Sequence, residues 1–299
     1  MKLASYKDGS RDGQLVVVSR DLTTAHFANG IAGRLQQVLD DWNFLSPQLE
    51  DLSVALNHGR ARHAFPFDPA LCMAPLPRAC HWAEGTEAGS ACPLRFAPSD
   101  DLLGPTDLLH VASERMGLDF DARVVVVTGD LARGTPADQA LDAVRLVALA
   151  NAVALRELGA AHARPTTAFA PVAVTPDELG GAWQQGRVAL AVHVQWNGKR
   201  WGVVDAGAGQ PAPFGDLLAD AARTRHVRAG SLVASGPLAA GDGTRGFARI
   251  ADRRAAEAAE HGEARTGWLR FGDTVRLEVK GADGQPVFGA IDQAVATPE

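Results

Sequence analysis

The stretch Arg123-Val-Val-Val-Val-Thr128 decides the fold, because four consecutive valines predict a strand that is buried on both faces. Asn197-Gly198 lies between two further β-rich stretches and is typical of a hairpin turn. Patterns of the same kind predict strands at residues 2–6, 14–19, 146–150, 188–196, 200–204, 232–234, 268–271 and 273–279. Apolar residues at helical spacing predict helices at residues 24–39, 47–56, 135–145 and 214–223. Many strands and few helices favour an α+β fold that is mainly β, with mixed and mostly antiparallel pairing.

The domain organisation follows from a polar break early in the chain. Residues 1–70 predict a small α+β domain, and residues 71–299 predict a larger β domain. The first domain holds two strands joined across the Gly- and Asp-rich stretch Lys7–Gly13. Residues 83–107 (AEGTEAGSACPLRFAPSDDLLGPTD) show no period and are expected to form a long surface loop.

Composition excludes several classes of protein. Hydrophobic residues make up 46% of the 299 residues and charged residues 21%, which excludes a mainly disordered chain. The formal net charge is −6 and no basic stripe is visible, so a nucleic-acid partner is not expected. No apolar run is long enough to span a bilayer, and the first residues hold no apolar segment of a secretion signal. The three cysteines are interpreted as free thiols, so we expect a cytoplasmic protein. Because no apolar run is long enough, we also expect no membrane partner.

Motifs of common enzymes are mostly absent from the sequence. Residues 241–246 (GDGTRG) fit the dinucleotide pattern G-x-G-x-x-G, but they follow no convincing strand and favour a glycine turn. Cys80, His81 and Cys92 could supply metal ligands, although their spacing is not that of a zinc site. Trp196 and Trp201 flank the hairpin turn, which predicts cross-strand packing, with a ligand shelf as the alternative.

Seven blocks resemble the fumarylacetoacetate hydrolase family, in its bacterial branch. They are YKDGSRDGQLVVVSRDL (6–22), LDDWNFLSPQL (39–49), HAFPFDP (63–69), MAPLPRA (73–79), TAFAPVAVTPDELG (167–180), RAGSLVASG (228–236) and FGDTVRLEVKGADGQPVFGAIDQAV (271–295). The resemblance implies a mixed β-roll behind a small α/β N-terminal domain, usually as a homodimer. It also implies cleavage of C–C bonds in β-diketones or acylpyruvates, or decarboxylation of related oxo acids. In the family, carboxylates hold Mg²⁺ or Ca²⁺ and a His–Glu pair activates water.

The positions that match the family's metal ligands depart from its pattern. Glu84 occupies the position of a family aspartate. Ala91 occupies the position of the family histidine that comes after this aspartate. The E-x-E of the central strand reads Asp121-Ala122-Arg123, so a cation replaces a carboxylate. Ala152 replaces the aspartate of the next ligand motif and carries no ligand atom.

The positions that match the substrate site also differ. Arg156 keeps the arginine of its motif, and Arg164 replaces a family lysine. Ser235 remains in a loop whose threonine hydroxyl is lost, and a segment that covers the substrate is replaced by residues 85–98. These residues form the candidate site for a substrate or anion, whose members are Arg123, Arg156, Arg164 and Ser235.

Electrostatics predicts that this site holds no divalent ion. Two unit charges 4 Å apart interact by about 4 kcal/mol at an effective dielectric constant of 20, and a divalent ion doubles that figure. Arg123 would repel the ion, and Ala152 would not attract it. We therefore expect no metal at the degenerate ligand positions Glu84, Asp121, Arg123 and Ala152, and no other cofactor. Instead, the Arg123 guanidinium is expected to bind Asp121, Glu84 or both.

Three interpretations of function remain open from the sequence. The first is a pseudoenzyme or a repurposed protein that binds a small acid or a protein partner. The second is a divergent metal-independent enzyme that hydrolyses, decarboxylates or isomerises an oxo acid, with Glu84 or Asp121 as the catalytic base. The third is a surviving metal hydrolase whose ligands lie elsewhere, for which Asp100, Asp101 and Asp119 are the nearby acids.

Overall fold

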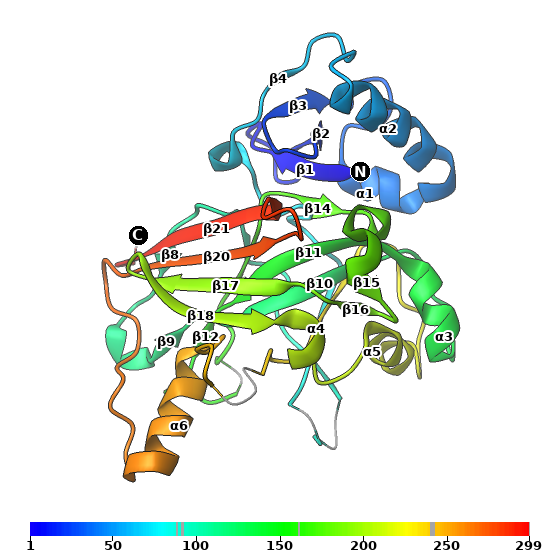
Figure 1. Ribbon diagram of the computed structural model, residues 1–299. Coiled ribbons are helices and arrows are strands. Elements are labelled where there is room, and N and C mark those ends of the chain that lie inside the picture. Colours follow the sequence, from blue (N-terminus) through cyan, green and yellow to red (C-terminus); the bar gives the residue numbers. More distant parts are fainter. Residues whose placement is uncertain (88, 91–92, 161, 240–242, 299) are drawn as a thin grey trace.

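A twelve-stranded sheet runs through both parts of the chain. The computed structural model describes residues 1–87, 89–90, 93–160, 162–239 and 243–298 (Figure 1). The strands follow one another in the order β4-β3-β2-β1-β14-β11-β10-β19-β5-β6, and β13 and β7 extend the sheet beside β11. Their bounds are β1 (Lys2–Tyr6), β2 (Gln14–Val18), β3 (Thr24–Phe27), β4 (Phe65–Pro66), β5 (His81–Gly85), β6 (Leu94–Phe96), β7 (Leu102–Leu103), β10 (Ala122–Thr128), β11 (Val144–Ala152), β13 (Thr167–Phe169), β14 (Ala173–Val174) and β19 (Ser231–Ala234).

A second sheet of five strands faces the larger one and closes the β-roll. Its order is β18-β17-β20-β21-β8, and β8 pairs with β21 in parallel while the other neighbours are antiparallel. The bounds are β8 (Leu109–His110), β17 (Ala191–Trp196), β18 (Lys199–Asp205), β20 (Thr274–Lys280) and β21 (Pro286–Ala296). Two-stranded pairs complete the described strands: β9 (Leu118–Asp119) with β12 (Ala154–Leu155), and β15 (Trp183–Gln184) with β16 (Arg187–Val188).

Strand β10 lies between two hydrophobic cores, which is why its four valines are all buried. Val124 and Val126 belong to the core between the two sheets, and Val125 and Val127 belong to the core on the opposite face. Side chains of a strand alternate between its faces, so consecutive apolar residues are needed only where both faces are covered.

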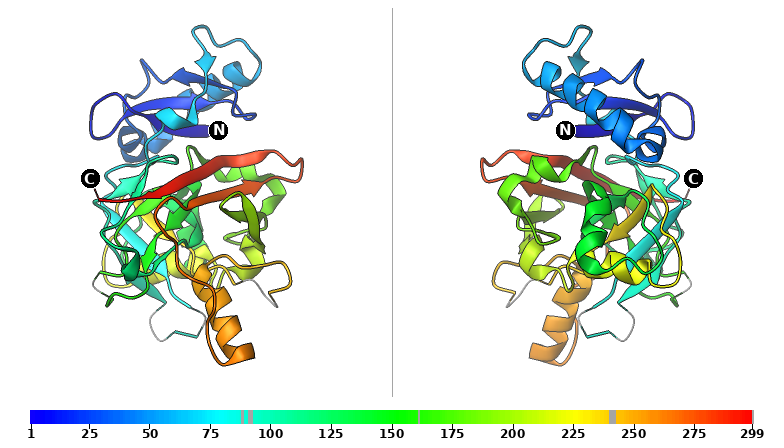
Figure 2. Two further views of the ribbon diagram at one scale, coloured as in Figure 1. Left: turned by 90° about the vertical axis from the view of Figure 1, so that its left-hand side faces the viewer. Right: turned by 90° about the vertical axis from the view of Figure 1, so that its right-hand side faces the viewer.

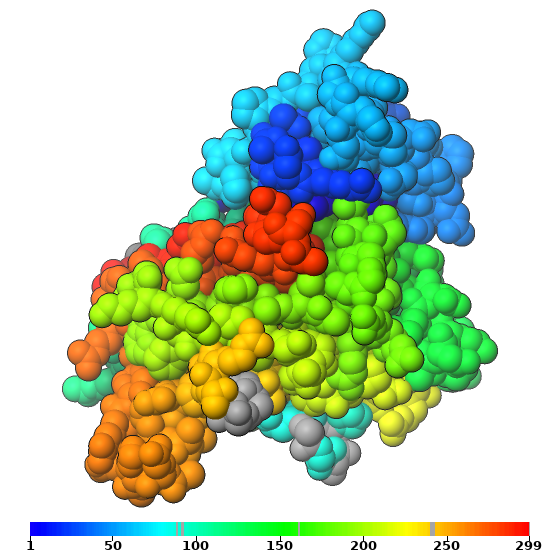
Figure 3. All heavy atoms as spheres, viewed as in Figure 1, coloured from blue at the N-terminus to red at the C-terminus, as the bar shows by residue number. Residues whose placement is uncertain are grey.

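The helices lie outside the sheets. Helices α1 (Leu35–Asp40) and α2 (Trp42–Asn57) belong to the small N-terminal domain, which sits on the roll next to the β20–β21 hairpin (Figures 1 and 3). The roll carries α3 (Ala137–Ala140), α4 (Ala206–Gly209), α5 (Phe214–Ala221) and α6 (Ile250–His261). Helix α6 projects from the end of the molecule opposite the N-terminal domain (Figure 2). Only Ile250 and Glu257 of α6 are buried, and Glu257 accepts hydrogen bonds from Arg265 and Thr266 after the helix.

Several expectations from the sequence pattern are wrong in detail. Residues 24–39 were expected to form one helix, but the first four are strand β3 and the helix begins at Leu35. Gly30 adopts a positive φ of 85° between them, a conformation that glycine tolerates and that interrupts a helix. Residues 268–271 contain no strand.

The segment 83–107 is also not simply a loop. It contributes the end of β5 and all of β6 and β7. Strand β5 forms because it pairs in parallel with β19, about 150 residues further along the chain, with Glu84 opposite Ala234. Such long-range pairing leaves no periodic pattern in a short, polar segment.

The helix expected at residues 135–145 is shorter than predicted, since α3 covers Ala137–Ala140, a 3-10 turn follows, and β11 begins at Val144. Most other expectations hold in the structure. Strands are expected and found over most of the predicted ranges, and Trp196 and Trp201 pack edge to face across the β17–β18 hairpin at 5.1 Å between ring centroids. Within the described part of the chain, no helix is long and apolar enough to cross a membrane. The boundary at residues 70 and 71 stays a prediction.

Candidate functional site

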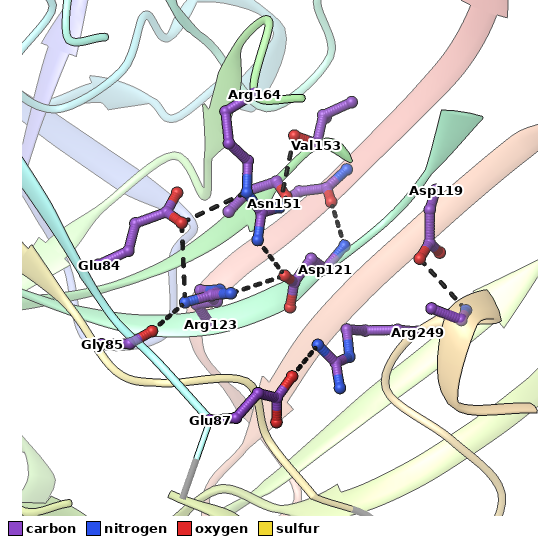
Figure 4. Close-up of polar contacts among 12 residues, drawn as sticks. Glu84, Gly85, Glu87, Asp119, Asp121, Arg123, Asn151, Val153, Arg164 and Arg249 are labelled. Carbon is purple, nitrogen blue, oxygen red and sulfur yellow. Dashed lines mark hydrogen bonds and ion pairs between the residues drawn. The ribbon is translucent and has the colours of Figure 1, made fainter. Parts of the chain in front are cut away.

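The residues singled out from the sequence meet where β5 and β19 end and the antiparallel strand β10 begins (Figure 4). Strand β19 lies between the other two, so it brings Glu84 of β5 toward Arg123 of β10. Glu84 and Asp121 are fully buried, and Arg123 is only 1% exposed. A guanidinium buried to this extent requires partners for its charge and its N–H groups.

Arg123 lies between the two carboxylates. Its Nη2 donates a hydrogen bond to Oδ2 of Asp121 at 2.8 Å, and its Nη1 lies 3.9 Å from Oε2 of Glu84. Nη1 also donates to the backbone carbonyls of Ser235 at 2.9 Å and Gly85 at 3.1 Å. The contact between Arg123 and Asp121 that the sequence predicts is therefore present.

Arg164 forms a second bridge between the same carboxylates. Its Nη2 donates to Oδ2 of Asp121 at 2.8 Å, and its Nε lies 3.3 Å from Oε2 of Glu84. Its Nη1 donates to the backbone carbonyl of Ala152. The guanidiniums of Arg123 and Arg164 thus contact the same carboxylate oxygens of Asp121 and Glu84 that would otherwise bind a metal ion.

Glu84 receives further donors from Arg95 and Trp82. Arg95 binds its Oε2 through Nε at 2.9 Å and through Nη2, and Trp82 Nε1 donates to its Oε1 at 3.0 Å. Burial works to raise the pKa of Glu84, but Arg123, Arg164 and Arg95 outweigh burial and lower it. The same balance, led by Arg123 and Arg164, lowers the pKa of Asp121 far below its usual range. Both carboxylates are therefore ionised at neutral pH, and neither is suited to act as a base near pH 7.

Asp119 connects this region to helix α6. Its carboxylate accepts hydrogen bonds from the backbone N–H of Ile250 at 2.7 Å and of Ala251 at 3.2 Å, and from Nε of Arg156 at 2.9 Å. An anion at the first turn satisfies helix N–H groups that lack intrahelical partners. Burial nevertheless raises the pKa of Asp119 to about 6, because it outweighs these donors.

The raised pKa of Asp119 predicts a pH-dependent stability. Between its unfolded pKa of about 3.9 and about 6, the folded state binds more protons than the unfolded state, so stability falls as pH rises through this window. Relative to the Asp119→Asn variant, the parent should lose on the order of 2–3 kcal/mol of unfolding free energy between pH 4 and 6. Urea unfolding at a series of pH values measures the difference, and parallel pH profiles of the two proteins would contradict it.

Arg249 lies between Asp121 and the start of α6. Its backbone forms a bridge with that of Asp121, and its side chain binds Asp252 and, at 2.9 Å through Nη1, Glu87. Burial opposes the charge of Arg249, but Asp121, Asp252 and Glu87 outweigh it and raise the pKa.

The charges of this group of residues balance. We call it the arginine–carboxylate cluster, and its members are Glu84, Glu87, Asp119, Asp121, Asp252, Arg95, Arg123, Arg156, Arg164 and Arg249. Five carboxylates face five guanidiniums, so the cluster is neutral without any bound ion.

The residues present do not fit a divalent metal ion. The nearest oxygen atoms of Glu84 and Asp121 already accept guanidinium N–H groups, and Ala152 offers only a backbone carbonyl that Arg164 occupies. In the ranges that the structure describes, no three His, Cys, Asp or Glu side chains gather as a metal site would require. Ala91 lies outside the described residues.

The other motifs from the sequence do not join this region. Cys80 is an exposed free thiol, and His81 accepts a hydrogen bond from Arg225, while Cys92 lies outside the described residues. Residues 241–242 of the glycine pattern also lie outside them. Asp100 and Asp101 are not members of the cluster, whereas Asp119 is.

Sequence reasoning missed several members of the cluster. Arg95 lies in the segment that was expected to be a loop, and Arg249 immediately precedes a helix that was not predicted. The carboxylate partner of Arg95 lies 11 residues away, and Arg249 has one partner nearby in the sequence, Asp252, and another, Glu87, 162 residues away. The local pair of Arg249 and Asp252 is the one signal that the sequence offers for this position.

Four buried polar atoms in the cluster and beside it have no hydrogen-bond partner within the described residues. They are Oδ1 of Asp121, Nε of Arg123, Nη2 of Arg156 and Oγ of Ser235. The two arginine nitrogens are donors, the ionised carboxylate oxygen of Asp121 is an acceptor, and the Ser235 hydroxyl is both.

Comparisons with known proteins agree over nearly the whole chain. Residues 1–78 match the model described as "Fumarylacetoacetase N-terminal domain 2", and residues 83–296 match "Fumarylacetoacetate (FAA) hydrolase C-terminal". Among curated proteins, none matches this sequence.

Solved structures share the fold at low sequence identity. Maleylpyruvate hydrolase from Sphingobium sp. SYK-6, in complex with manganese(II) and pyruvate, is 15% identical with a TM-score of 0.72, and the match covers 100% of both chains. A putative HpcE protein from Mycobacterium smegmatis is 17% identical with a TM-score of 0.70 and full coverage of both chains. Fumarylacetoacetate hydrolase from Exiguobacterium antarcticum is 16% identical with a TM-score of 0.68, and 99% of each chain is covered. At these identities the likeness shows a common fold.

Proposed function

Because the chain belongs to the fumarylacetoacetate hydrolase family, we propose that it is a pseudoenzyme of this family, in which arginines replace the divalent metal. The family resemblance and the mixed β-roll expected from the sequence are confirmed. The loss of metal-dependent C–C bond hydrolysis is our proposal, and it goes beyond the family membership and the fold.

The observation that carries the proposal is the position of Arg123. Its guanidinium lies 2.8 Å from Asp121 and 3.9 Å from Glu84, between the two carboxylates that remain at the family's metal-ligand positions. A metal ion in the same space would meet a fixed positive charge in a medium of low dielectric constant. The neutral charge of the whole cluster supports the proposal further, since no ion is needed to balance it.

The carboxylates also lack the properties of a general base. A base for water near neutral pH needs a pKa close to the working pH. The pKa values of Glu84 and Asp121 are lowered by the surrounding arginines, so both are weak bases. This argues against the alternative of a metal-independent enzyme in which either carboxylate acts as the base.

The proposal predicts no metal-dependent hydrolysis. Incubation of the protein with acylpyruvates and Mg²⁺ or Mn²⁺ is expected to release pyruvate no faster than the metal-containing buffer does. A family hydrolase in the same assay serves as the positive control, and calorimetry with Mn²⁺ is expected to give no binding isotherm. Pyruvate release that requires Mn²⁺ and is abolished in the Asp121→Asn variant would overturn the proposal.

A small carboxylic acid as ligand is a second candidate, supported by the unpaired donors of Arg123, Arg156 and Ser235. Since maleylpyruvate hydrolase has been solved with pyruvate, this oxo acid is the natural probe. Calorimetry with pyruvate, on the parent and on Arg156→Gln, tests it. Saturable binding that the variant loses favours a repurposed binding protein, and no heat in the parent favours a pseudoenzyme without this ligand. The homodimer implied by the resemblance stays a prediction.

A further inference from the structure

A separate basic hollow lies at the start of strands β5 and β19. The two strands run in parallel with His81 opposite Ser231, and the hollow beside them has a volume of about 240 Å³. Its walls are formed by Cys80, His81, Arg225, His226, Val227, Arg228 and Ser231. None of these residues belongs to the arginine–carboxylate cluster, so the hollow is independent of the proposed function.

Arg225 is held in place without a carboxylate. Its guanidinium carbon lies 4.4 Å above the centre of the Phe96 ring, and its Nη2 donates to Nε2 of His81 at 2.6 Å. Because His81 accepts this bond, it is neutral, and burial together with the charge of Arg225 lowers its pKa to about 4. Across the described parts of the chain, no carboxylate lies within ion-pair distance of Arg225, whereas the nearby Arg223 is paired with Asp220.

The remaining walls add positive charge and hydrogen-bond donors. Arg228 is exposed, and its nearest acid is Asp130, 3.8 Å from Nη1 and itself mostly exposed. The Ser231 hydroxyl donates to the backbone carbonyl of Arg228 at 2.7 Å and so forms a fixed part of the wall, and His226 contributes an imidazole. The hollow is therefore positive on the surface of a chain whose net charge is −6.

We propose that this hollow, which we call the Arg225 pocket, binds the phosphate group of a small anion. A guanidinium that is fixed on an aromatic ring and lacks an acid partner is arranged in advance to receive an oxyanion through two parallel N–H bonds. A phosphate group carries more charge than a carboxylate near neutral pH, so two arginines attract it more strongly. The volume of the hollow suits one such group together with a small part of its molecule.

Cys80 provides a built-in reporter of occupancy. Its thiol is exposed at the wall of the pocket, 3.7 Å from Oγ of Ser231. Cys72 is buried, and burial raises the pKa of its thiol, so it reacts slowly. The test measures alkylation of Cys80 by iodoacetamide, a neutral reagent, in a Cys92→Ser background with mass spectrometry of the peptide. Inorganic phosphate is the ligand probe, and chloride at equal ionic strength is the reference.

Phosphate at about four times its Kd should slow alkylation of Cys80 about fivefold, because the free pocket falls by that factor. Arg225→Gln should abolish this protection, and Arg228→Gln should weaken it. Arg223→Gln is the matched control, which should keep full protection. Thermal melting verifies that each variant is folded. Equal protection by phosphate, acetate and chloride, or full protection in a folded Arg225→Gln variant, would overturn the proposal.

Discussion

Replacement of Arg123 by methionine should lower the free energy of unfolding by about 3–5 kcal/mol, because it leaves the buried cluster with one carboxylate in excess and removes the donor of two buried backbone carbonyls. Arg123 is 1% exposed and Asp121 is fully buried, so water cannot replace the lost guanidinium. Methionine retains most of the side-chain volume, which keeps a cavity from dominating the result. Urea unfolding followed by circular dichroism measures the change.

Two controls separate the loss of charge from a general defect. Arg95→Met removes an arginine that also binds Glu84 but is 43% exposed, and it should cost less than about 1 kcal/mol. Asp121→Asn added to Arg123→Met should recover part of the loss, since the uncompensated charge is then gone. If Arg123→Met were as stable as the parent, the guanidinium would not be the replacement for the metal charge.

Restoring the carboxylates should create a metal site where the parent has none. The triple variant Arg123→Glu/Ala152→Asp/Arg164→Lys places carboxylates at positions 123 and 152 and removes both bridging guanidiniums from Glu84 and Asp121. Without metal, the like charges should destabilise the variant strongly. Oxygen ligands of this number suit Mn²⁺ or Mg²⁺.

Metal should therefore raise the melting temperature of the triple variant and leave that of the parent unchanged. At a metal concentration of about 100 times Kd, the stabilisation amounts to about 2.7 kcal/mol. Ala152→Asp alone is the matched control, and it should gain nothing because Arg123 remains. A triple variant that is folded and shows no response to Mn²⁺ would mean that more than charge separates this site from a metal site.

Some features of the fold follow from local sequence. The valines of 123–128 predict a strand covered on both faces, and the two cores on either side of β10 bear this out. The Asn197-Gly198 hairpin and the tryptophans beside it are local features, so their geometry could also be predicted. The resemblance to the family rests on blocks that keep their order along the chain, and it supplied the roll that no periodic pattern could.

The candidate site was only partly predictable. The loss of carboxylates at positions 123 and 152 can be read directly, and opposite charges at Asp121 and Arg123 on one strand face predict a contact. The loss of the metal-dependent activity and the binding of a small acid both stay predictions, which the experiments above test.

What the sequence determined by itself is the set of charges and the strand that carries them, because burial pattern and side-chain alternation are properties of neighbouring residues. What only the tertiary structure decided is which charges meet. Glu84 reaches Arg123 through the parallel pairing of β5 with β19, inside a segment whose composition predicted a loop. Arg249 reaches the cluster because Asp119, far away in the chain, holds the start of α6. Ion pairs between distant residues form only after strands with no local signature have paired, and so the neutral balance of the cluster is a property of the folded chain alone.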